Sequence, residues 1–259
     1  MLNTITEEAI VIKNGAKTFQ TDVENPTYVL KNVDLSIKKG EFYVLLGPSG
    51  CGKSTLLNII AGFLDLSVGE LQIETSREEN RDGRGFVFQS ADSALFPWLT
   101  VEENISFGLK MKNVPAEKRK KVANTFIKLT GLLGHAKKFP DNLSGGMKQR
   151  VQLARVLANE PEILLMDEPF GALDAMTRRT MQNELIRIWK ETNKTVIFVT
   201  HDIQEAILLG QKIGIMSVGP NSRIETTYDV NLPYPRDITS VDFNNHYKQV
   251  QTHFEDFTI

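Results

Sequence analysis

One octapeptide, GPSGCGKS at residues 47–54, constrains the fold of this chain more than any other stretch. It follows the apolar run FYVLL and precedes the helical pattern TLLNIIAG, so a strand, a glycine-rich loop and a helix are expected in that order. Glycines let main-chain N–H groups wrap around a phosphate, and the helix N-terminus adds positive potential. Lys53 is expected to reach the β- and γ-phosphates, and the Ser54 hydroxyl to bind Mg²⁺. The motif therefore predicts a nucleotide-binding loop.

Apolar runs elsewhere in the chain place this loop in an α/β fold. Short runs rich in Val, Ile and Leu alternate with segments of helical periodicity, which is typical of a buried parallel sheet. These runs are FYVLL, GFVF, EILLMD, TVIFVT and IGIMS. Three early segments, AIVIKNG, YVLKNVDLSIKKGE and GELQIE, alternate with a period close to two. We therefore predict a mostly parallel core sheet with an antiparallel β subdomain in the N-terminal third.

The pattern changes twice further along the chain. Residues 101–142 read as helix or loop with no clear strand, which indicates a helical insertion. Residues after 217 contain few periodic apolar positions and are expected to form a weakly packed extension. The predicted organisation is a domain over residues 1–217 followed by an extension over 218–259. Within that domain, the core lobe covers about 1–90 and 150–217, and the helical lobe about 91–149.

Composition narrows the setting in which the chain works. The 30 Lys and Arg against 32 Asp and Glu give a net charge of -2, so no basic excess favours a nucleic-acid partner. A single cysteine cannot form an internal disulfide, which fits a reducing compartment. The N-terminal residues lack the apolar core of a signal peptide, and no apolar run is long enough to span a membrane. A cytoplasmic protein is predicted, with any membrane contribution coming from a partner.

Polar side chains follow three of the predicted strands. Asp167 and Glu168 end the run EILLMDE, where Asp167 is expected to hold Mg²⁺ and Glu168 to orient or deprotonate the attacking water. His201 follows TVIFVT and is expected to contact the γ-phosphate. Gln89 follows GFVF and offers an amide to Mg²⁺ or to the water. The alternative interpretations are a capped turn for the acidic pair and a structural histidine at the end of a strand.

A second glycine-rich phosphate cradle begins with LSGGMKQR at residues 143–150. Ser144 and the two glycines expose N–H groups at a helix N-terminus, while Met147, Val151 and Ala154 begin an apolar face that continues to Ala158. The glycine loop itself, residues 144–146, has no lysine and no magnesium ligand of its own. It therefore reads as half of a site that a second chain completes.

In combination, these motifs resemble the ATP-binding cassette (ABC) ATPases over roughly residues 9–217. GPSGCGKST resembles the Walker A motif, ILLMDE the Walker B motif and LSGGM the family signature, with Met147 in place of the commoner glutamine. Gln89 corresponds to the Q-loop, GALD at 171–174 to the D-loop and His201 to the switch histidine. The resemblance implies a P-loop NTPase fold that binds ATP and Mg²⁺ and hydrolyses ATP.

The family pattern also assigns individual residues. Phe19 would stack on adenine, although a Phe at that position can also serve strand packing. Cys51 is expected to fill space in the loop rather than to act in catalysis. Two cassettes meet head to tail in this family, so a homodimer or a dimer with a close paralogue is implied. The implied catalytic residues are Lys53, Gln89, Glu168 and His201; the ATP contacts Phe19, Gly47, Pro48, Ser49, Gly50, Cys51, Gly52, Lys53, Ser54 and Thr55; the contacts to the partner's ATP Ser144, Gly145, Gly146 and Asp174; and the magnesium ligands Ser54, Gln89 and Asp167.

Without a membrane span or a second cassette, the chain resembles the ATPase subunit of a bacterial ABC importer at the cytoplasmic face of the membrane. Leu95, Phe96 and Trp98 are expected to form a groove for a transmembrane permease, although ordinary packing between lobes is the alternative. A secreted solute-binding protein would act indirectly. The stretches ALFPWLTVEENISFGL, DEPFGALDAMTR and THDIQEA resemble the nitrate, sulfonate, taurine and bicarbonate group.

Three other functions compete with import. An ABC ATPase that regulates a membrane complex without transport would share the permease groove, so it is the main alternative. The DNA-repair and ribosomal branches would need a long heptad insertion or two cassettes in one chain, and neither pattern is present. A small-molecule kinase is disfavoured because Glu168 is placed to act on water.

Overall fold

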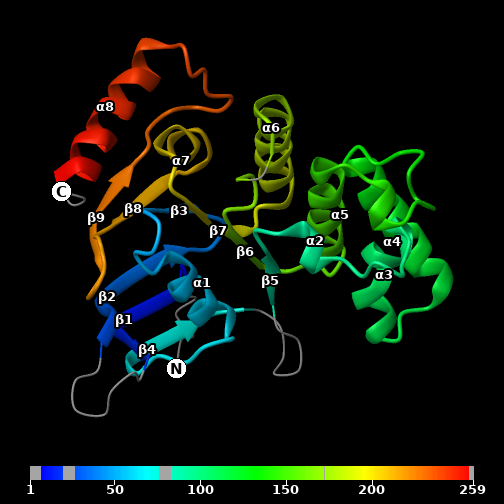
Figure 1. Ribbon diagram of the computed structural model, residues 1–259, viewed down its shortest axis with the longest axis horizontal. Coiled ribbons are helices and arrows are strands. Elements are labelled where there is room, and N and C mark those ends of the chain that lie inside the picture. The colour runs from blue at the N-terminus through cyan, green and yellow to red at the C-terminus, as the bar shows by residue number, and fades with distance from the viewer. Residues whose placement is uncertain (1–6, 20–26, 76–82, 172, 257–259) are drawn as a thin grey trace. The chain divides into compact units, whose positions relative to one another are not determined.

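The computed structural model describes residues 7–19, 27–75, 83–171 and 173–256. The chain divides into two compact units, which Figure 1 shows with their elements labelled. The first unit comprises residues 1–78 and 193–259, and the second comprises residues 79–192. Within the described residues, none of the helices combines the length and the apolarity needed to cross a membrane.

An antiparallel sheet forms one layer of the first unit. Its strands are β1 (Glu8–Phe19), β2 (Thr27–Lys38) and β4 (Val68–Ile73), in the order β2-β1-β4. Both neighbours pair antiparallel with β1. In β2, buried and exposed residues alternate from Val33 to Lys38, as a sheet with one covered face requires. The antiparallel β subdomain is therefore confirmed.

The parallel strands of the first unit are centred on β3 (Phe42–Leu46), which is buried along its whole length. It pairs in parallel with β7 (Thr195–Thr200) on one side and with β8 (Lys212–Met216) on the other. A strand covered on both faces reads as a continuous apolar run, which is why FYVLL and TVIFVT are recognisable in the sequence. Helices α1 (Lys53–Ala61) and α7 (Ile203–Leu209) follow β3 and β7 respectively.

The C-terminal residues form a paired strand and a helix that contacts the rest of the first unit, which the expectation of a weakly packed extension did not include. β9 (Ile224–Asp229) pairs antiparallel with β8, and α8 (Val241–Asp256) packs against α7. Figure 1 shows β9, in orange, next to β8 and α8, in red, near α7. Phe243 and Val250 of α8 are buried. These two residues lie seven positions apart, about two helical turns, and so share one face of α8. The sequence did not predict β9 because its residues are too polar to form an apolar run.

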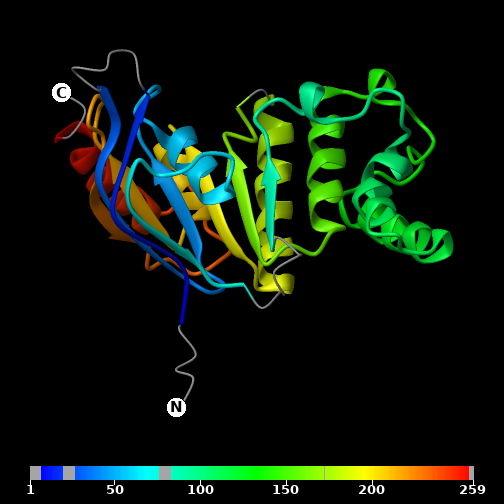
Figure 2. The same ribbon diagram turned by 90° about the horizontal axis from the view of Figure 1, so that it is seen from below.

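The second unit combines a parallel strand pair with helices. β5 (Arg84–Val87) pairs in parallel with β6 (Ile163–Asp167). The helices α5 and α6 run alongside one another (Figure 2), and α5 also packs against β5. The described residues between 91 and 142 contain helices and turns without a strand, which confirms the helical insertion. The helices are α2 (Ala91–Ala94), α3 (Val101–Met111), α4 (Ala116–Leu129), the 3-10 turn η1 (Pro140–Asn142), α5 (Gly145–Leu157) and α6 (Ala175–Thr192).

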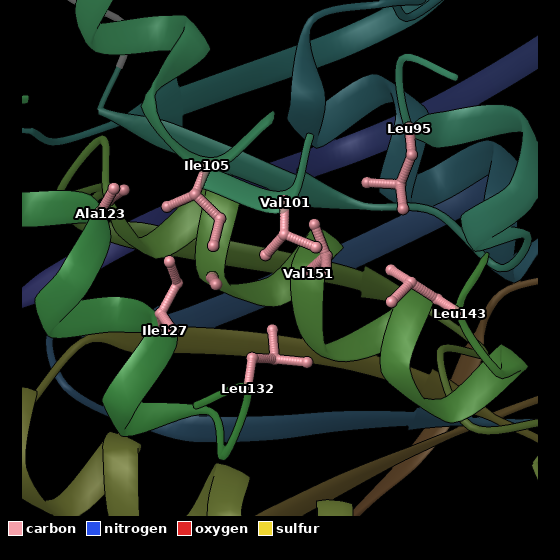
Figure 3. Packing of buried hydrophobic residues seen from close by; sticks show 10 residues of the cluster. Leu95, Val101, Ile105, Ala123, Ile127, Leu132, Leu143 and Val151 are labelled. Carbon is pink, nitrogen blue, oxygen red and sulfur yellow. The ribbon is translucent and has the colours of Figure 1, made fainter. Parts of the chain in front are cut away.

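A hydrophobic cluster holds the helical insertion together (Figure 3). It takes Val101 and Ile105 from α3, Ile127 from α4 and Val151 from α5, with Leu95 from the preceding loop. The apolar face predicted for α5 is confirmed, because Val151, Ala154 and Ala158 are buried in this cluster and Met147 packs against it. The cluster therefore fixes the start of α5, where the second phosphate cradle lies.

Candidate active site

The loop at residues 47–52 joins the end of β3 to the start of α1, in the predicted order of strand, loop and helix. Gly50 and Gly52 have φ angles of 82° and 95°, which only glycine adopts without strain. Gly52 is the N-cap of α1, and no side chain caps it. The N-terminal N–H groups of α1 therefore face the loop, as an anion-binding helix N-terminus requires.

Gly47 lies directly against the side chain of Cys51. A Cβ atom on Gly47 would lie 2.7 Å from Cys51 Sγ, closer than real contacts allow. Cys51 is buried, and its main-chain N–H donates to the Pro48 carbonyl at 3.4 Å. The geometry agrees with the expectation that Cys51 fills the interior of the loop.

Lys53 lies inside the curl of the same loop. Its Nζ donates to the carbonyl oxygens of Gly47 and Pro48, both at 2.8 Å, and the residue is only 4% exposed. A buried ammonium needs such partners, because removing it from water is otherwise costly. The loop thus holds a positive charge at its centre, while Ser54 is exposed next to it.

His201 follows a strand that lies next to this loop. Thr200, the last residue of β7, pairs in register with Leu46, the last residue of β3. The chain therefore delivers the glycine-rich loop and His201 from adjacent strand ends, at the edge where α/β sheets bind ligands. This pairing brings two of the predicted site elements together within one unit.

Phe19 ends β1, and its ring is 43% exposed. The Nζ of Lys17 lies 5.4 Å from the ring centroid, within cation–π distance. An exposed ring of this kind is open to stacking, as the adenine hypothesis requires.

In the second unit, the acidic pair and Gln89 leave neighbouring strands. Val87 of β5 pairs with Met166 of β6, so Gln89 and Asp167 emerge at the same edge of this pair. Glu168 directly follows β6 with a φ of 39°, a left-handed conformation that is uncommon for a residue with a side chain. Such backbone strain is more frequent at functional sites than elsewhere. The predicted grouping of these three residues is thus compatible with the strand register.

The two signature glycines have different surroundings. Ser144 is the N-cap of α5, and its Oγ accepts the Met147 N–H at 3.4 Å. A Cβ on Gly146 would lie 2.5 Å from Thr177 Cγ2, so packing against α6 requires glycine there. A Cβ on Gly145 would meet nothing within 4 Å. No internal contact of the described chain explains Gly145.

Asp174 lies close to this cradle through Thr177. Its Oδ1 accepts the Thr177 N–H at 3.0 Å, and the hydrogen bonds to Thr177 lower the pKa of the Asp174 carboxyl. The side chain is exposed and stays ionised at neutral pH. The second residue of the GALD stretch lies outside the described residues. Asp174 and the signature therefore share one surface of the second unit.

The segment after Gln89 forms an aromatic surface. Phe96 lies 4.4 Å from Phe107 and 5.6 Å from Trp98 between ring centroids, and Trp98 is 69% exposed. A cavity of about 400 Å³ is lined by Phe96 and Phe107 together with the cations Arg84, Lys112 and Arg155. A second cavity of about 290 Å³ lies beside Trp98 and Phe107.

Leu95 departs from its predicted place in this groove. It is 4% exposed and belongs to the hydrophobic cluster of Figure 3, so it anchors the segment from beneath. The sequence run ALFPWL does not reveal this, because a loop without regular structure has no periodicity that separates inward from outward residues. Phe96 is half-buried and Trp98 is exposed, so these two residues can still line the predicted groove.

Two cations of α5 that the sequence interpretation missed hold the same segment. Lys148 forms an ion pair with Asp92 of α2, while Arg155 donates to the Ala94 carbonyl at 2.6 Å and lies 5.5 Å from the Phe96 ring centroid. Burial lowers the pKa of the Arg155 guanidinium, which nevertheless stays charged. The signature helix is thereby attached to the groove. No motif marks these residues, since their partners lie about sixty residues away in the sequence.

Comparison with known proteins places this geometry in a family. Residues 30–171 match the family model described as ABC transporter. The chain is 46% identical to the taurine import ATP-binding protein of Pelagibacter ubique over 227 residues. This match covers 87% of this chain and 83% of that protein. The chain is 45% identical over 249 residues to the aliphatic sulfonates import ATP-binding protein of Bacillus subtilis, covering 95% and 94%.

A solved structure supports the same assignment. A dimeric ATP-binding cassette in a post-hydrolysis state, bound to ADP and Pi, superposes with a TM-score of 0.74 at 37% identity. The match covers 86% of this chain and all of that one. The motifs, their places at the strand ends and these matches agree, and the chain belongs to the ABC transporter family as an ATP-hydrolysing cassette.

Proposed function

We propose that this chain is the ATPase subunit of an importer that takes up small organic sulfonates through a separate transmembrane permease. The observation that carries the ATPase part is the register of β3 and β7, which sets the glycine-rich loop beside His201. Two of the relatives are named as taurine and aliphatic sulfonates import proteins, which supports the solute class. ATP hydrolysis is proposed to take place at the cytoplasmic face of the membrane.

The chemistry assigned to the chain follows from its residues. Lys53 and the N–H groups of the loop would bind the phosphates, with Ser49, Thr55 and Phe19 as further ATP contacts. Glu168 would orient or deprotonate the attacking water, and His201 would hold the γ-phosphate.

Mg²⁺ is proposed as the metal that accompanies ATP. Ser54, Gln89 and Asp167 offer a hydroxyl, an amide and a carboxylate, which are the hard oxygen donors that Mg²⁺ prefers. The described residues contain no group of three or more His, Cys, Asp or Glu side chains that could hold a metal ion. The single carboxylate among Ser54, Gln89 and Asp167 fits Mg²⁺, which is usually held by one or two carboxylates together with substrate phosphates. When bound, Mg²⁺ would neutralise phosphate charge.

A second cassette is proposed to complete each ATP site. Gly145 has open space around its Cβ position, and a close approach of the proposed partner's ATP would account for a glycine there. Ser144, Gly146 and the exposed Asp174 share that surface. The dimeric cassette that superposes on this chain supports such a partner.

The permease is proposed to dock on the aromatic surface at Phe96 and Trp98, where the cavity lined by Arg84, Lys112 and Arg155 adds positive charge. Replacing Trp98 with alanine is expected to lower permease-stimulated hydrolysis about tenfold, as loss of an interface anchor does, and to leave basal hydrolysis unchanged. The unfolding temperature should stay constant because the side chain is 69% exposed. ATPase assays with and without permease in detergent or nanodiscs would measure this.

Leu133→Ala is the matched control, because Leu133 is an apolar side chain of the same unit that is 66% exposed. It should leave both rates unchanged. Equal loss of basal and stimulated hydrolysis in Trp98→Ala would instead favour ordinary packing of the aromatic surface.

Uptake measurements test the importer proposal as a whole. The chain would be produced together with the permease and solute-binding protein of a sulfonate importer, in cells that lack sulfonate uptake. Labelled taurine and alkanesulfonates should accumulate, and Lys53→Ala should reduce accumulation to background because the loop loses its central charge. Nitrate or bicarbonate uptake alone would contradict the solute class. Hydrolysis with no uptake of any of these anions would favour regulation of a membrane complex instead.

A further inference from the structure

The C-terminal segment is fastened to the end of α7 by two side chains. Arg236 Nη1 donates to the carbonyl oxygens of Ile207 and Gly210, the latter at 2.6 Å. The Tyr234 hydroxyl donates to the Leu209 carbonyl at 2.6 Å. The last carbonyls of a helix have no partner within the helix, and a cation is favourable at that end. These three bonds therefore cap α7 from residues that lie more than twenty positions later.

Arg236 is built into this position. It is 5% exposed, and its Nη2 and Nε donate to the carbonyls of Val230 and Leu232 at 3.2 and 3.1 Å. Burial lowers the pKa of its guanidinium and raises the pKa of the Tyr234 hydroxyl to about 12, so both groups remain protonated donors near neutral pH. Prolines at 233 and 235 fix the backbone on either side of Tyr234. A rigid segment thus joins α7 to β9.

The other end of α7 is joined directly to His201. Asp202 is the N-cap, and its Oδ1 accepts the Glu205 N–H at 3.0 Å. Thr200 Oγ1 donates to Glu205 Oε2 at 2.6 Å and accepts the Asp202 N–H at 3.1 Å. The residues on both sides of His201 are therefore bonded to each other and to the first turn of α7.

This arrangement transmits the position of α7 to His201. On the strand side, Thr200 is fixed by its pairing with Leu46. On the helix side, α7 has only seven residues, too few to hold a helix without tertiary contacts. Residues 205–209 are buried, and the helix packs against β3, β7 and α8, so the C-terminal segment supplies part of the contacts that set its axis. A shift of α7 would turn the backbone of its N-cap and move the imidazole beside it.

We propose that Arg236, assisted by Tyr234, is a positioning residue that holds His201 in place for ATP hydrolysis through the length of α7. This inference rests on the proposed role of His201 at the γ-phosphate. It gives the C-terminal extension a task in the catalytic cycle. Arg236 itself touches neither ATP nor the reacting atoms.

Arg236→Lys tests the proposal, because lysine keeps the charge but cannot reach four carbonyls with one ammonium. The kcat for MgATP hydrolysis should fall about tenfold, while the KM should change less than about twofold, since coupled residues interact at this level. Phosphate release from the purified chain would be followed at several ATP concentrations. An unchanged kcat would overturn the inference.

A double variant separates positioning from general stability. If Arg236 acts through His201, Arg236→Lys should cause no further loss in a His201→Ala background. Multiplicative losses would overturn the inference while leaving the role of His201 intact. An unchanged kcat in His201→Ala alone would instead contradict the proposed function, so the two failures are distinguishable.

Two further variants guard against misfolding. Val33→Ala removes a buried side chain of β2, away from α7, and should lower the unfolding temperature without altering kcat. A drop in kcat of equal size there would overturn the inference. Tyr234→Phe removes a single hydroxyl and should lower kcat about two- to threefold, as loss of one ordinary hydrogen bond does. If Arg236→Lys does not fold, an unchanged kcat in Tyr234→Phe overturns the proposal.

Discussion

Replacing Glu168 with glutamine is expected to lower the kcat of ATP hydrolysis by about 100-fold or more while leaving ATP affinity nearly unchanged. Glutamine has the same shape but no basic carboxylate, so water is no longer deprotonated or oriented by a charge. Because the ATP contacts assigned to the loop remain, the nucleotide should stay bound. Phosphate release, with ATP binding measured separately, would check both values.

The same variant should accumulate as an ATP-bound dimer if, as proposed, hydrolysis reopens the paired cassettes. Light scattering with saturating MgATP would measure the mass. The matched control is Glu160→Gln, because Glu160 precedes β6 with a similar left-handed backbone, φ 53° against 39° for Glu168. It should hydrolyse ATP normally and cycle between states. A Glu168→Gln chain that remains monomeric, or hydrolyses ATP at the normal rate, would contradict the assignment.

Gly145→Ala is expected to weaken ATP-dependent dimerisation without harming the folded monomer. A Cβ at this position meets nothing within 4 Å, and alanine in the first turn of a helix is favourable by up to about 1 kcal/mol. The unfolding temperature should therefore hold or rise slightly. In the dimer, the methyl group would stand between the cradle and the partner's phosphates, so we expect at least tenfold weaker association, about 1.4 kcal/mol.

Gly146→Ala should behave in the opposite way. Its Cβ would lie 2.5 Å from Thr177 Cγ2, so the monomer itself should lose about 1–3 kcal/mol of stability. Thr177→Ser removes that methyl group and should restore most of the loss. Thermal unfolding of the three variants, combined with dimerisation assays, separates an internal contact from an external one. Normal dimerisation of Gly145→Ala would rule out the proposed contact at this glycine.

The core of the fold could be predicted because its strands are buried on both faces. FYVLL and TVIFVT read as uninterrupted apolar runs, and polar residues that follow such runs must emerge at the sheet edge. This is why the sequence alone places His201, Asp167 and Gln89 at strand ends. The turn chemistry of the loop at 47–54 is also local, since the positive φ angles of Gly50 and Gly52 favour glycine and Gly47 faces the nearby Cys51.

The rest depends on contacts that no local pattern encodes. β9 carries polar residues on a half-covered strand, and α8 contributes only Phe243 and Val250 to the core. Arg155 and Arg236 look like ordinary charged residues in the sequence, yet the half-buried Arg155 and the buried Arg236 each donate to carbonyls far along the chain. Leu95 and Trp98 lie three residues apart in one loop, but one is buried and the other exposed.

The open space around Gly145 has a consequence for how mutations in two copies of the gene would combine in the proposed dimer. Each ATP would lie between the loop at 47–54 of one chain and the Gly145 cradle of the other. A lesion in the loop of one chain and a lesion at Gly145 of its partner would meet at the same ATP and spare the second. If one chain carried both lesions, each of the two ATP sites of the dimer would contain one of them. Two defective alleles could therefore complement each other, whereas one doubly defective allele would be dominant.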